Sequence, residues 1–392
     1  MMNFGFIGIG QGGGNIVNCF GKDFPTIAIN TAPNDLEGLN NIPKHQRILA
    51  KVTEGGAGKS IRYGEKAILT HQNQIVDTIK LSMGDVDRIW LVAGLGGGSG
   101  SLGLIQTSIL LSKMGKRHSV IVTLPTDDEG TVEKVNSIIA LKQLYDLHGH
   151  SKNFQSYLIV DNNELKKRIL DSGQFTYERF WDEANSLIYR QFKMFYDLSR
   201  LSGTTAFDTE DYKSMFDEKG GLVFAESFVD ISSGDNALAA AVMQSWRDTV
   251  FVSGDVTQAT AIAVVVQRPT GFDKGGQEIN TLFEKMKEQI GSGKFCRGVY
   301  YNDSILDKAA GAVGQGKPVK ISSVVAGIPF PVNIVADLKG QVDREIADIK
   351  QKQRRDSLDL DIGSYLSFVD QNNGENDSIE ELDFTIFNKK TS

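Results

Sequence analysis

The sequence predicts an α/β protein with a parallel sheet in its first half, a long central helix, a smaller second α/β domain and a long C-terminal helix with a tail. Three observations predict this class: short apolar runs alternate with helical patterns, a helical stretch at 174–201 carries aromatic residues on more than one face, and 333–355 carries one apolar stripe. The expected segments are 1–175 for the first domain, 176–202 for the central helix, 203–332 for the second domain, 333–355 for the C-terminal helix and 356–392 for a flexible acidic tail.

The expected strands of the first half are almost wholly apolar, as strands buried on both faces of a sheet must be. They are 3–9, 25–30, 88–93, 118–125 and 156–161, and the first helix is expected over 14–20. Alternation of strand and helix implies parallel strands with right-handed crossovers. Ligands of such sheets bind at the carboxyl ends of the strands, so the loops there are the place to look for a site.

The second half repeats the alternation on a smaller scale. Strands are expected at 221–228, 259–267 and 319–326, with helices at 236–248 and 277–290. The C-terminal helix places Ile334, Leu338, Val342, Ile346 and Ile349 at spacings of four, four, four and three, which is one helical face. The polar, acidic residues after it are typical of disorder.

Composition excludes several classes of protein. The 392 residues contain 42 Lys and Arg against 49 Asp and Glu, and the net charge of −7 argues against direct binding of nucleic acid by a broad basic surface. No apolar run approaches the roughly 20 residues that span a bilayer, so we expect no membrane contact and a cytoplasmic location. Cys19 and Cys296 lie far apart and away from any His cluster, which favours neither a disulfide nor a zinc site.

The first glycine-rich loop, GIGQGGGN at 8–15, follows a strand and opens a helix. Glycines at that corner let the backbone approach a polyphosphate, and the free amides at the helix start point toward it. The segment also satisfies G-x-G-x-x-G, the dinucleotide motif. That motif wants an acidic residue after the second strand, where this chain has Asn30, and this counts against NAD.

Two further loops are candidates for phosphate contacts. The segment GGAGKS at 55–60 resembles a P-loop, but Thr53 stands where the first glycine of that motif belongs, so we reject a Walker A site and keep the loop as a possible contact. The segment GLGGGSGS at 94–101 directly follows a strand and opens a helix. It lies at the same sheet edge as the first loop, and two such nests of amides can surround a triphosphate.

These loops resemble, in order, those of the tubulin/FtsZ superfamily of GTP-dependent filament proteins. GLGGGSGS is similar to the tubulin signature GGGTGSG, and GIGQGGGN resembles the first nucleotide loop of FtsZ. INTAPNDL with Asn30, EGGAGK and PTDDEG resemble the second, third and fifth loops, and the resemblance implies that Glu129 faces the ribose. The chain departs from FtsZ at Glu133, where FtsZ carries a basic residue, and Lys134 is the alternative there.

The resemblance also implies how the base is recognised. Asn162 stands where the family places a guanine-reading asparagine, Trp181 where an aromatic ring stacks on the base, and Asn185 where an amide reads the edge of the base. An amide carries both donors and acceptors and can tell guanine from adenine. The alternatives are a helix cap for Asn162 and a solvent-facing side chain for Asn185.

The segment FDTEDY at 207–212 resembles the synergy loop of the family. There, two acidic residues enter the nucleotide pocket of the next subunit, which implies that Asp208 and Asp211 orient the water that attacks the γ-phosphate. Two alternatives remain open. Asp208 is a plain helix cap, or Glu210 takes the catalytic place if the register slips.

The resemblance thus implies GTP and GDP as ligands, Mg²⁺ carried by the phosphates, and open filaments made by head-to-tail contacts. The residues expected at the nucleotide are Gly10, Gln11, Gly12, Gly13, Asn15, Asn30, Gly56, Ala57, Gly58, Lys59, Gly96, Gly97, Gly98, Ser99, Gly100, Glu129, Asn162, Trp181 and Asn185. The long C-terminal helix favours the plasmid and phage tubulins (TubZ and PhuZ types), in which it straps onto the next subunit or binds a DNA-binding adaptor, and the filament moves DNA. An FtsZ-like division protein and, less strongly, an NAD-binding Rossmann oxidoreductase are the alternatives.

Overall fold

The computed structural model describes residues 2–52, 56–173, 176, 179–198, 203–205, 207–231, 236–252, 254–270, 276–305 and 318–356. Two compact units make up the chain. The N-terminal unit comprises Asn3–Phe154, Val160–Lys167 and the chain from Pro331 onward, and the central unit comprises Met1–Met2, Gln155–Ile159 and Arg168–Phe330. The expected tail, 357–392, lies outside the described residues.

The N-terminal unit is built on parallel strands in the order β3-β2-β1-β4-β5. These are β1 (Phe4–Ile9), β2 (Thr26–Asn30), β3 (Arg47–Leu49), β4 (Arg88–Gly94) and β5 (His118–Thr123). Every residue of β1, β2 and β5 is buried, so helices must cover both faces of this sheet. Because β1 pairs in parallel with both β2 and β4, the carboxyl ends of all three strands lie at one edge of the sheet.

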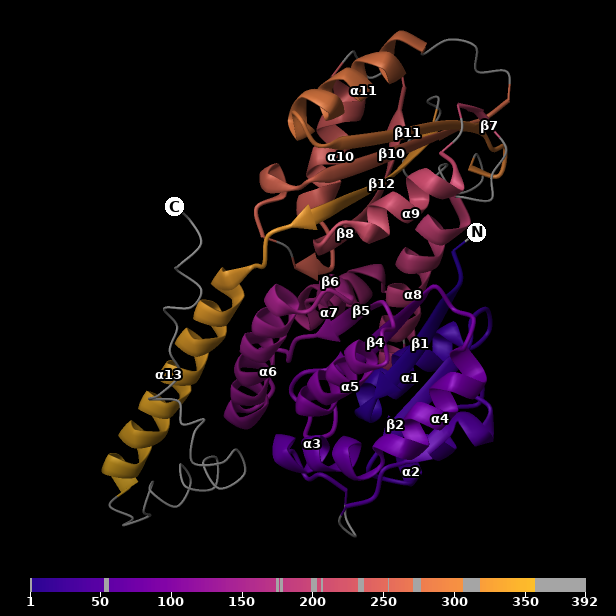
Figure 1. Cartoon of the computed structure of the whole chain (residues 1–392). Coiled ribbons are helices and arrows are strands. Elements are labelled where there is room, and N and C mark those ends of the chain that lie inside the picture. The colour runs from indigo at the N-terminus through magenta and orange to yellow at the C-terminus, as the bar shows by residue number, and fades with distance from the viewer. Residues whose placement is uncertain are drawn as a thin grey trace. The chain divides into compact units, whose positions relative to one another are not determined.

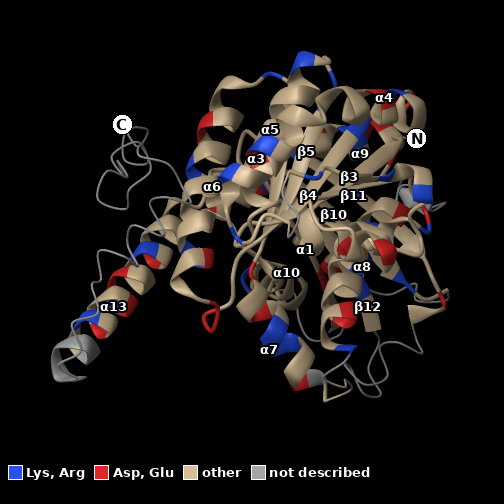
Figure 2. Cartoon of the chain, turned by 90° about the horizontal axis from the view of Figure 1, so that it is seen from below, with Lys and Arg blue, Asp and Glu red and all other residues tan. Residues whose placement is uncertain are grey.

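Helices cover this sheet on both sides and follow the strands in sequence (Figure 1). The helices of this unit are α1 (Gly10–Phe20), α2 (Asn34–Glu37), α3 (Ile61–Thr70), α4 (Gln72–Met83), α5 (Ser101–Lys113), α6 (Thr131–His150), α7 (Asn162–Ser172) and α13 (Val332–Asp356). The C-terminal helix α13 packs along α6, although about 200 residues separate them in the sequence. Figure 2 shows Lys and Arg interspersed with Asp and Glu along α13.

The central unit is a mixed sheet with its own helices. Its strands follow the order β6-β8-β12-β10-β11-β7, with β8 antiparallel to β12 and β10 parallel to β11. The strands are β6 (Phe154–Val160), β7 (Gly203–Thr205), β8 (Gly220–Asp230), β9 (Phe251–Val252), β10 (Ala261–Arg268), β11 (Lys294–Tyr301) and β12 (Pro318–Ile328). The helices are α8 (Phe180–Leu198), α9 (Thr209–Asp217), α10 (Ala237–Arg247) and α11 (Gly276–Ile290).

The expected strands of both halves are present, and two helix starts were predicted wrongly. Helix α1 begins at Gly10, four residues before the expected start, because the glycines themselves form its first turn. Helix α8 begins at Phe180, and Thr176 lies outside any helix, so the expected start at Gln174 is wrong. The C-terminal helix has the expected span, but Ile346 and Ile349 of its apolar stripe are only half-buried.

Strand β11 was not expected from the sequence. Its residues KFCRGVYY alternate between buried and exposed positions, with charged side chains at Lys294 and Arg297, so it lacks the continuous apolar run that marks its neighbours. Among the described residues, no helix is both long enough and apolar enough to cross a membrane.

Candidate functional site

The N-terminus of α1 is open to a ligand. Gly10 has φ +72°, a left-handed conformation that favours glycine, and a Cβ there would lie 3.1 Å from the amide nitrogen of Gly100. Gly13 packs directly on β4, where a Cβ would collide with the carbonyl oxygen of Val92. The helix has no side-chain cap and no acidic residue in its first turn. Its first amides therefore remain available to an anion.

A second open helix start follows β4. Helix α5 also has no side-chain cap and no acidic residue in its first turn. Gly98 is buried under the third loop, because a Cβ there would lie 2.8 Å from the backbone of Lys59 and Ser60. Gly97 is exposed, and a Cβ there would meet nothing within 4 Å. Gly98 is thus needed for packing, whereas Gly97 leaves the backbone accessible from outside.

The second and third loops converge on this segment through one threonine. Thr31 Oγ1 lies 2.7 Å from Ser99 Oγ and accepts a hydrogen bond of 3.1 Å from the amide of Ala57. The Asn30 Oδ1 atom accepts from the amides of Thr31 (2.7 Å) and Ala32 (3.2 Å). Asn30 is buried, so its side chain shapes the second loop from within.

Asn136, on α6, was missed by the sequence reasoning and ties two of the loops together. Its Nδ2 donates to the carbonyl oxygens of Lys59 (2.9 Å) and Gly96 (3.0 Å). Its Oδ1 is buried and has no hydrogen-bond partner in the described part of the chain. Lys59 also pairs with Glu133, the residue that stands where FtsZ carries a basic side chain. Helix α6 was not predicted, so nothing in the sequence indicated that the Asn136 side chain would be buried against these loops.

Other expected contact residues lie at the surface of these loops. Gln11, Gly12 and Asn15 are exposed on the first turns of α1, and Gly58 and Lys59 are exposed with φ of +54° and +68°. Together with the residues above, the structure brings the first, second and third loops of the resemblance and the segment GLGGGSGS at 94–101 to one edge of the sheet.

The loop 125–130 joins the same edge. Glu129 Oε1 accepts from the amide (3.1 Å) and the hydroxyl (3.3 Å) of Thr126. A Cβ on Gly96 would lie 3.5 Å from the other carboxylate oxygen of Glu129, so the loop approaches the glycine-rich segment 94–101. Asn162 is the first residue of α7. The capping hydrogen bond there comes from Asp161 Oδ1, which accepts from the amide of Asn163 at 2.7 Å, and not from Asn162.

The residues expected at the base lie on α8 of the central unit. Trp181 is 52% exposed, which is unusual for so large an apolar side chain, and its ring meets that of Phe180 edge-on at 5.2 Å. Asn185 lies one turn later and is half-buried. The helix therefore presents an aromatic face and an amide one turn apart.

The two aspartates expected to be catalytic are joined in a capping box at the start of α9. Asp208 Oδ1 accepts from the amides of Glu210 (2.8 Å) and Asp211 (2.9 Å), and Asp211 Oδ2 accepts from the amide of Asp208 at 3.4 Å. The capping alternative for Asp208 is therefore present in the structure. Asp208 and Glu210 are exposed and Asp211 is half-buried.

Strand β11 holds this acidic turn from beneath through two residues that the sequence reasoning missed. The Cys296 thiol donates to Asp211 Oδ1 at 3.4 Å, and burial, reinforced by the Asp211 charge, raises the pKa of Cys296 to about 12. The Tyr300 hydroxyl accepts from the Phe207 amide at 2.7 Å and donates to the Phe207 carbonyl at 3.2 Å. Burial raises the pKa of Tyr300 as well. Because β11 was not predicted, neither contact was foreseeable.

The site fits a nucleotide polyphosphate and offers no cage for a metal. Uncapped helix starts and tightly packed glycines form the cradle, and Asn136 Nδ2 holds the backbone of two of its loops through the carbonyl oxygens of Lys59 and Gly96. Among the described residues, no group of three or more His, Cys, Asp or Glu side chains is placed to hold a metal ion. Mg²⁺ commonly reaches such sites on the phosphates of its nucleotide, with few protein ligands.

Comparison with known proteins agrees with this geometry. The model of the tubulin/FtsZ family, GTPase domain, matches residues 3–169. The tubulin-like protein TubZ of Bacillus cereus is 22% identical over 98% of this chain and 92% of its own length. The tubulin-like protein CetZ of Pyrococcus abyssi is 28% identical over 75% of this chain and 80% of its own length.

Solved structures show the same fold. A GTPγS-form protofilament of Bacillus thuringiensis serovar israelensis TubZ superimposes with a TM-score of 0.75 at 17% identity, covering 91% of this chain and 95% of that one. CetZ1 from Haloferax volcanii, a GDP-bound monomer, gives a TM-score of 0.66 at 20% identity, covering 88% and 99%. At these identities the likeness establishes the fold, which is the α/β fold of tubulin-like proteins.

Proposed function

We propose that this chain binds GTP, assembles head to tail and hydrolyses GTP between subunits, because residues 3–169 match the model of the tubulin/FtsZ family, GTPase domain. The observation that carries the proposal is the convergence of uncapped helix starts and glycine loops at one sheet edge. The amides of Gly10–Gly13 and Gly96–Gly100 would hold the phosphates, with Gly56–Lys59 closing over them. Glu129 would face the ribose, and Asn162, Trp181 and Asn185 would contact guanine.

The acidic turn would act in trans. Asp208 and Asp211 would orient the attacking water in the site of an adjoining copy, and Mg²⁺, when bound with the nucleotide, would neutralise phosphate charge. A heterologous contact of this kind does not close and builds open filaments. A site divided between copies predicts hydrolysis that rises more steeply than linearly with protein concentration.

The test is light scattering and pelleting of the purified chain with GTP, GDP or NAD, together with phosphate release. We expect polymer with GTP, and turnover per chain that increases above a threshold concentration. Asp211→Ala should give persistent polymer with turnover reduced at least about a hundredfold, in the range that loss of a general acid or base produces. Glu210→Ala is the matched control, because Glu210 is an exposed acid on the same turn.

Three outcomes would overturn parts of the proposal. Equal turnover per chain at all concentrations would refute the shared site. Loss of turnover in Glu210→Ala with retention in Asp211→Ala would transfer the catalytic role to Glu210. Saturable binding of NAD without binding of GTP would restore the oxidoreductase alternative.

For the cellular role, we propose segregation or positioning of plasmid or phage DNA through a DNA-binding adaptor on the C-terminal helix or tail. Its support is the resemblance of the long C-terminal helix to those of plasmid and phage tubulins, and α13 spans 25 residues. Removing the chain from its host should destabilise the replicon that encodes it and leave division intact. Filamentous, undivided cells would instead favour the FtsZ-like alternative.

A further inference from the structure

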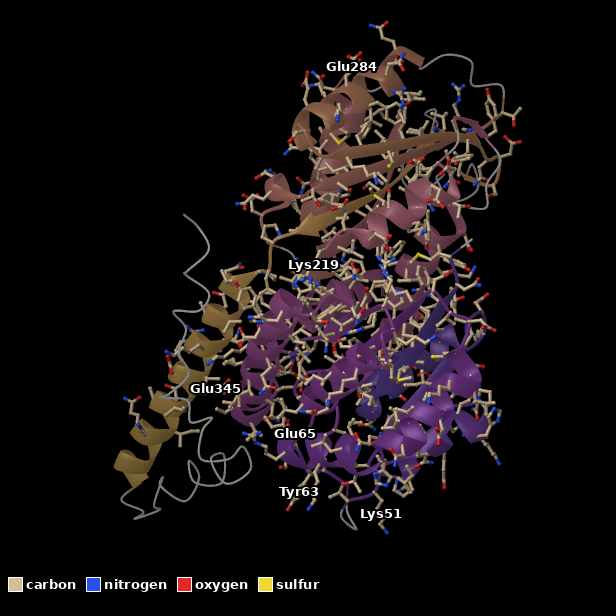
Figure 3. All side chains as sticks on the ribbon, in the orientation of Figure 1. Lys51, Tyr63, Glu65, Lys219, Glu284 and Glu345 are labelled. Atoms are coloured by element: carbon tan, nitrogen blue, oxygen red, sulfur yellow. The ribbon has the colours of Figure 1, made fainter. Side chains whose placement is uncertain are left out.

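A buried lysine joins the C-terminal helix to the candidate nucleotide site. Lys134, near the start of α6, is 1% exposed, and its Nζ forms an ion pair with Glu345 on α13. The second carboxylate oxygen of Glu345 accepts from the Thr131 hydroxyl at 2.6 Å. Figure 3 shows Glu345 on α13. A buried ammonium needs a counter-charge, so Glu345 contributes more than a surface ion pair would.

The same lysine fixes the loop that carries Glu129. Lys134 Nζ also donates to the carbonyl oxygen of Asp127 at 2.9 Å. A second residue of α13, Gln341, donates from Nε2 to Asp127 Oδ1 at 3.1 Å. The C-terminal helix therefore reaches Asp127 both directly and through Lys134.

Asp127 in turn fixes the start of α7. Its amide donates to Asn163 Oδ1 at 2.9 Å, and its Oδ1 accepts from Asn163 Nδ2 at 3.3 Å. Asn163 adjoins Asn162, the residue expected to read guanine. One connected set of contacts thus runs from α13 through Asp127 to the residues expected at the ribose and the base.

We propose that Glu345 is a positioning residue for the nucleotide site, and that docking of α13 on α6 and binding of guanine nucleotide stabilise each other. The inference rests on the proposed function, since it concerns the same site. Glu345 acts through Lys134 and Asp127, and it touches no nucleotide itself. Coupling between two binding events is reciprocal, so each must strengthen the other by the same factor.

The experiment uses the full chain as a dilute monomer with fluorescent mant-GDP, together with hydrogen exchange of α13. In the wild-type chain, GDP should slow exchange in α13 and in residues 125–130. Glu345→Ala should weaken mant-GDP binding by about fivefold or more, the lower bound of typical coupling, and should abolish the effect of GDP on α13. Asp348→Ala, an exposed acid less than one turn away on the same helix, is the matched control and should bind like wild type.

Glu345→Gln keeps the length of the side chain and its hydrogen-bonding capacity, and it serves if Glu345→Ala does not fold. We expect it to retain more of the mant-GDP affinity than Glu345→Ala, because Gln still accepts from Lys134. Two results would overturn the inference: exchange of α13 unaffected by GDP in the wild-type chain, or wild-type affinity in a folded Glu345 variant whose α13 has lost its protection. A wild-type chain that binds neither GTP nor GDP would instead refute the proposed function.

Discussion

Among the described helices, some starts have a side-chain cap and others have none, so they differ in whether a side chain already satisfies their first amides. Helices α1 and α5 have no side-chain cap and no acidic residue in the first turn. Helix α9 has a complete capping box from Asp208 and Asp211. A helix start without a cap leaves donors that an anion can satisfy, whereas a capped start is already satisfied by its own side chains.

This difference in capping determines which atoms the starts of α1 and α5, and the start of α9, can offer to a ligand. At α1 and α5 the groups on offer are backbone amides; Gly13 and Gly98 allow close packing there, and Gly97 leaves the backbone uncovered. At α9 the carboxylates serve the fold first, and any catalytic use comes in addition. Substitutions at α1 and α5 should therefore distinguish packing from ligand contact. Substitutions at α9 should distinguish helix capping from catalysis.

The largest effect is expected at Gly13. A Cβ there would collide with the Val92 carbonyl oxygen, so Gly13→Ala forces the backbone of α1 away from β4. We expect a loss of about 2 kcal/mol or more in unfolding free energy, the usual cost of overpacking a core. Thermal unfolding followed by circular dichroism measures it.

Gly97→Ala is the control for that experiment, because a Cβ at Gly97 meets nothing within 4 Å. Its unfolding should match wild type while its affinity for GTP falls, since the added methyl group blocks approach to the backbone. Wild-type affinity in Gly97→Ala would show that no ligand approaches there.

The parts of the site that the sequence predicts are the glycine loops, and the parts that it does not predict are long-range side-chain contacts. Glycine loops after buried strands can be recognised in the sequence because their chemistry belongs to the backbone, although Gly10 and Gly13 lie in the first turn of α1 and not in a loop before it. Asn136 and Glu345 were not predicted as parts of the site, because their contacts join residues 77 and 211 positions apart. Such contacts depend on helix packing that no local pattern encodes.

At the acidic turn 208–211, the sequence pattern is recognised but does not decide between two roles for the same carboxylates. The spacing of Asp208 and Asp211 predicts two carboxylates on one turn, and a plain helix cap is the alternative for Asp208. The structure contains the box. Only a substitution that preserves the cap while removing the charge can separate the two roles.

Asp208 is expected to give a smaller effect on stability than Gly13. Asp208→Ala removes a side-chain cap and should cost about 1 kcal/mol of unfolding free energy. Asp208→Asn keeps an equally good capping oxygen, so its stability should remain near that of wild type. If the carboxylate also serves hydrolysis, phosphate release falls in both variants, and unfolding free energy falls only in Asp208→Ala. If Asp208→Asn hydrolyses GTP as fast as the wild-type chain, then Asp208 only caps α9 and has no role in hydrolysis.

The smallest effect concerns the thiol beneath the acidic turn. With its pKa raised to about 12, Cys296 is almost wholly protonated at pH 8 and should react with iodoacetamide far more slowly than the half-buried Cys19. Burial is the main cause and the Asp211 charge is the second, so Asp211→Asn should lower the pKa of Cys296 and raise its alkylation rate, whereas Glu210→Gln should not. Mass spectrometry of each cysteine over time measures both rates. Alkylation of Cys296 as fast as that of Cys19 would mean that α9 does not rest on β11 in solution, and that the hydrogen bond from Cys296 does not hold Asp211 in place.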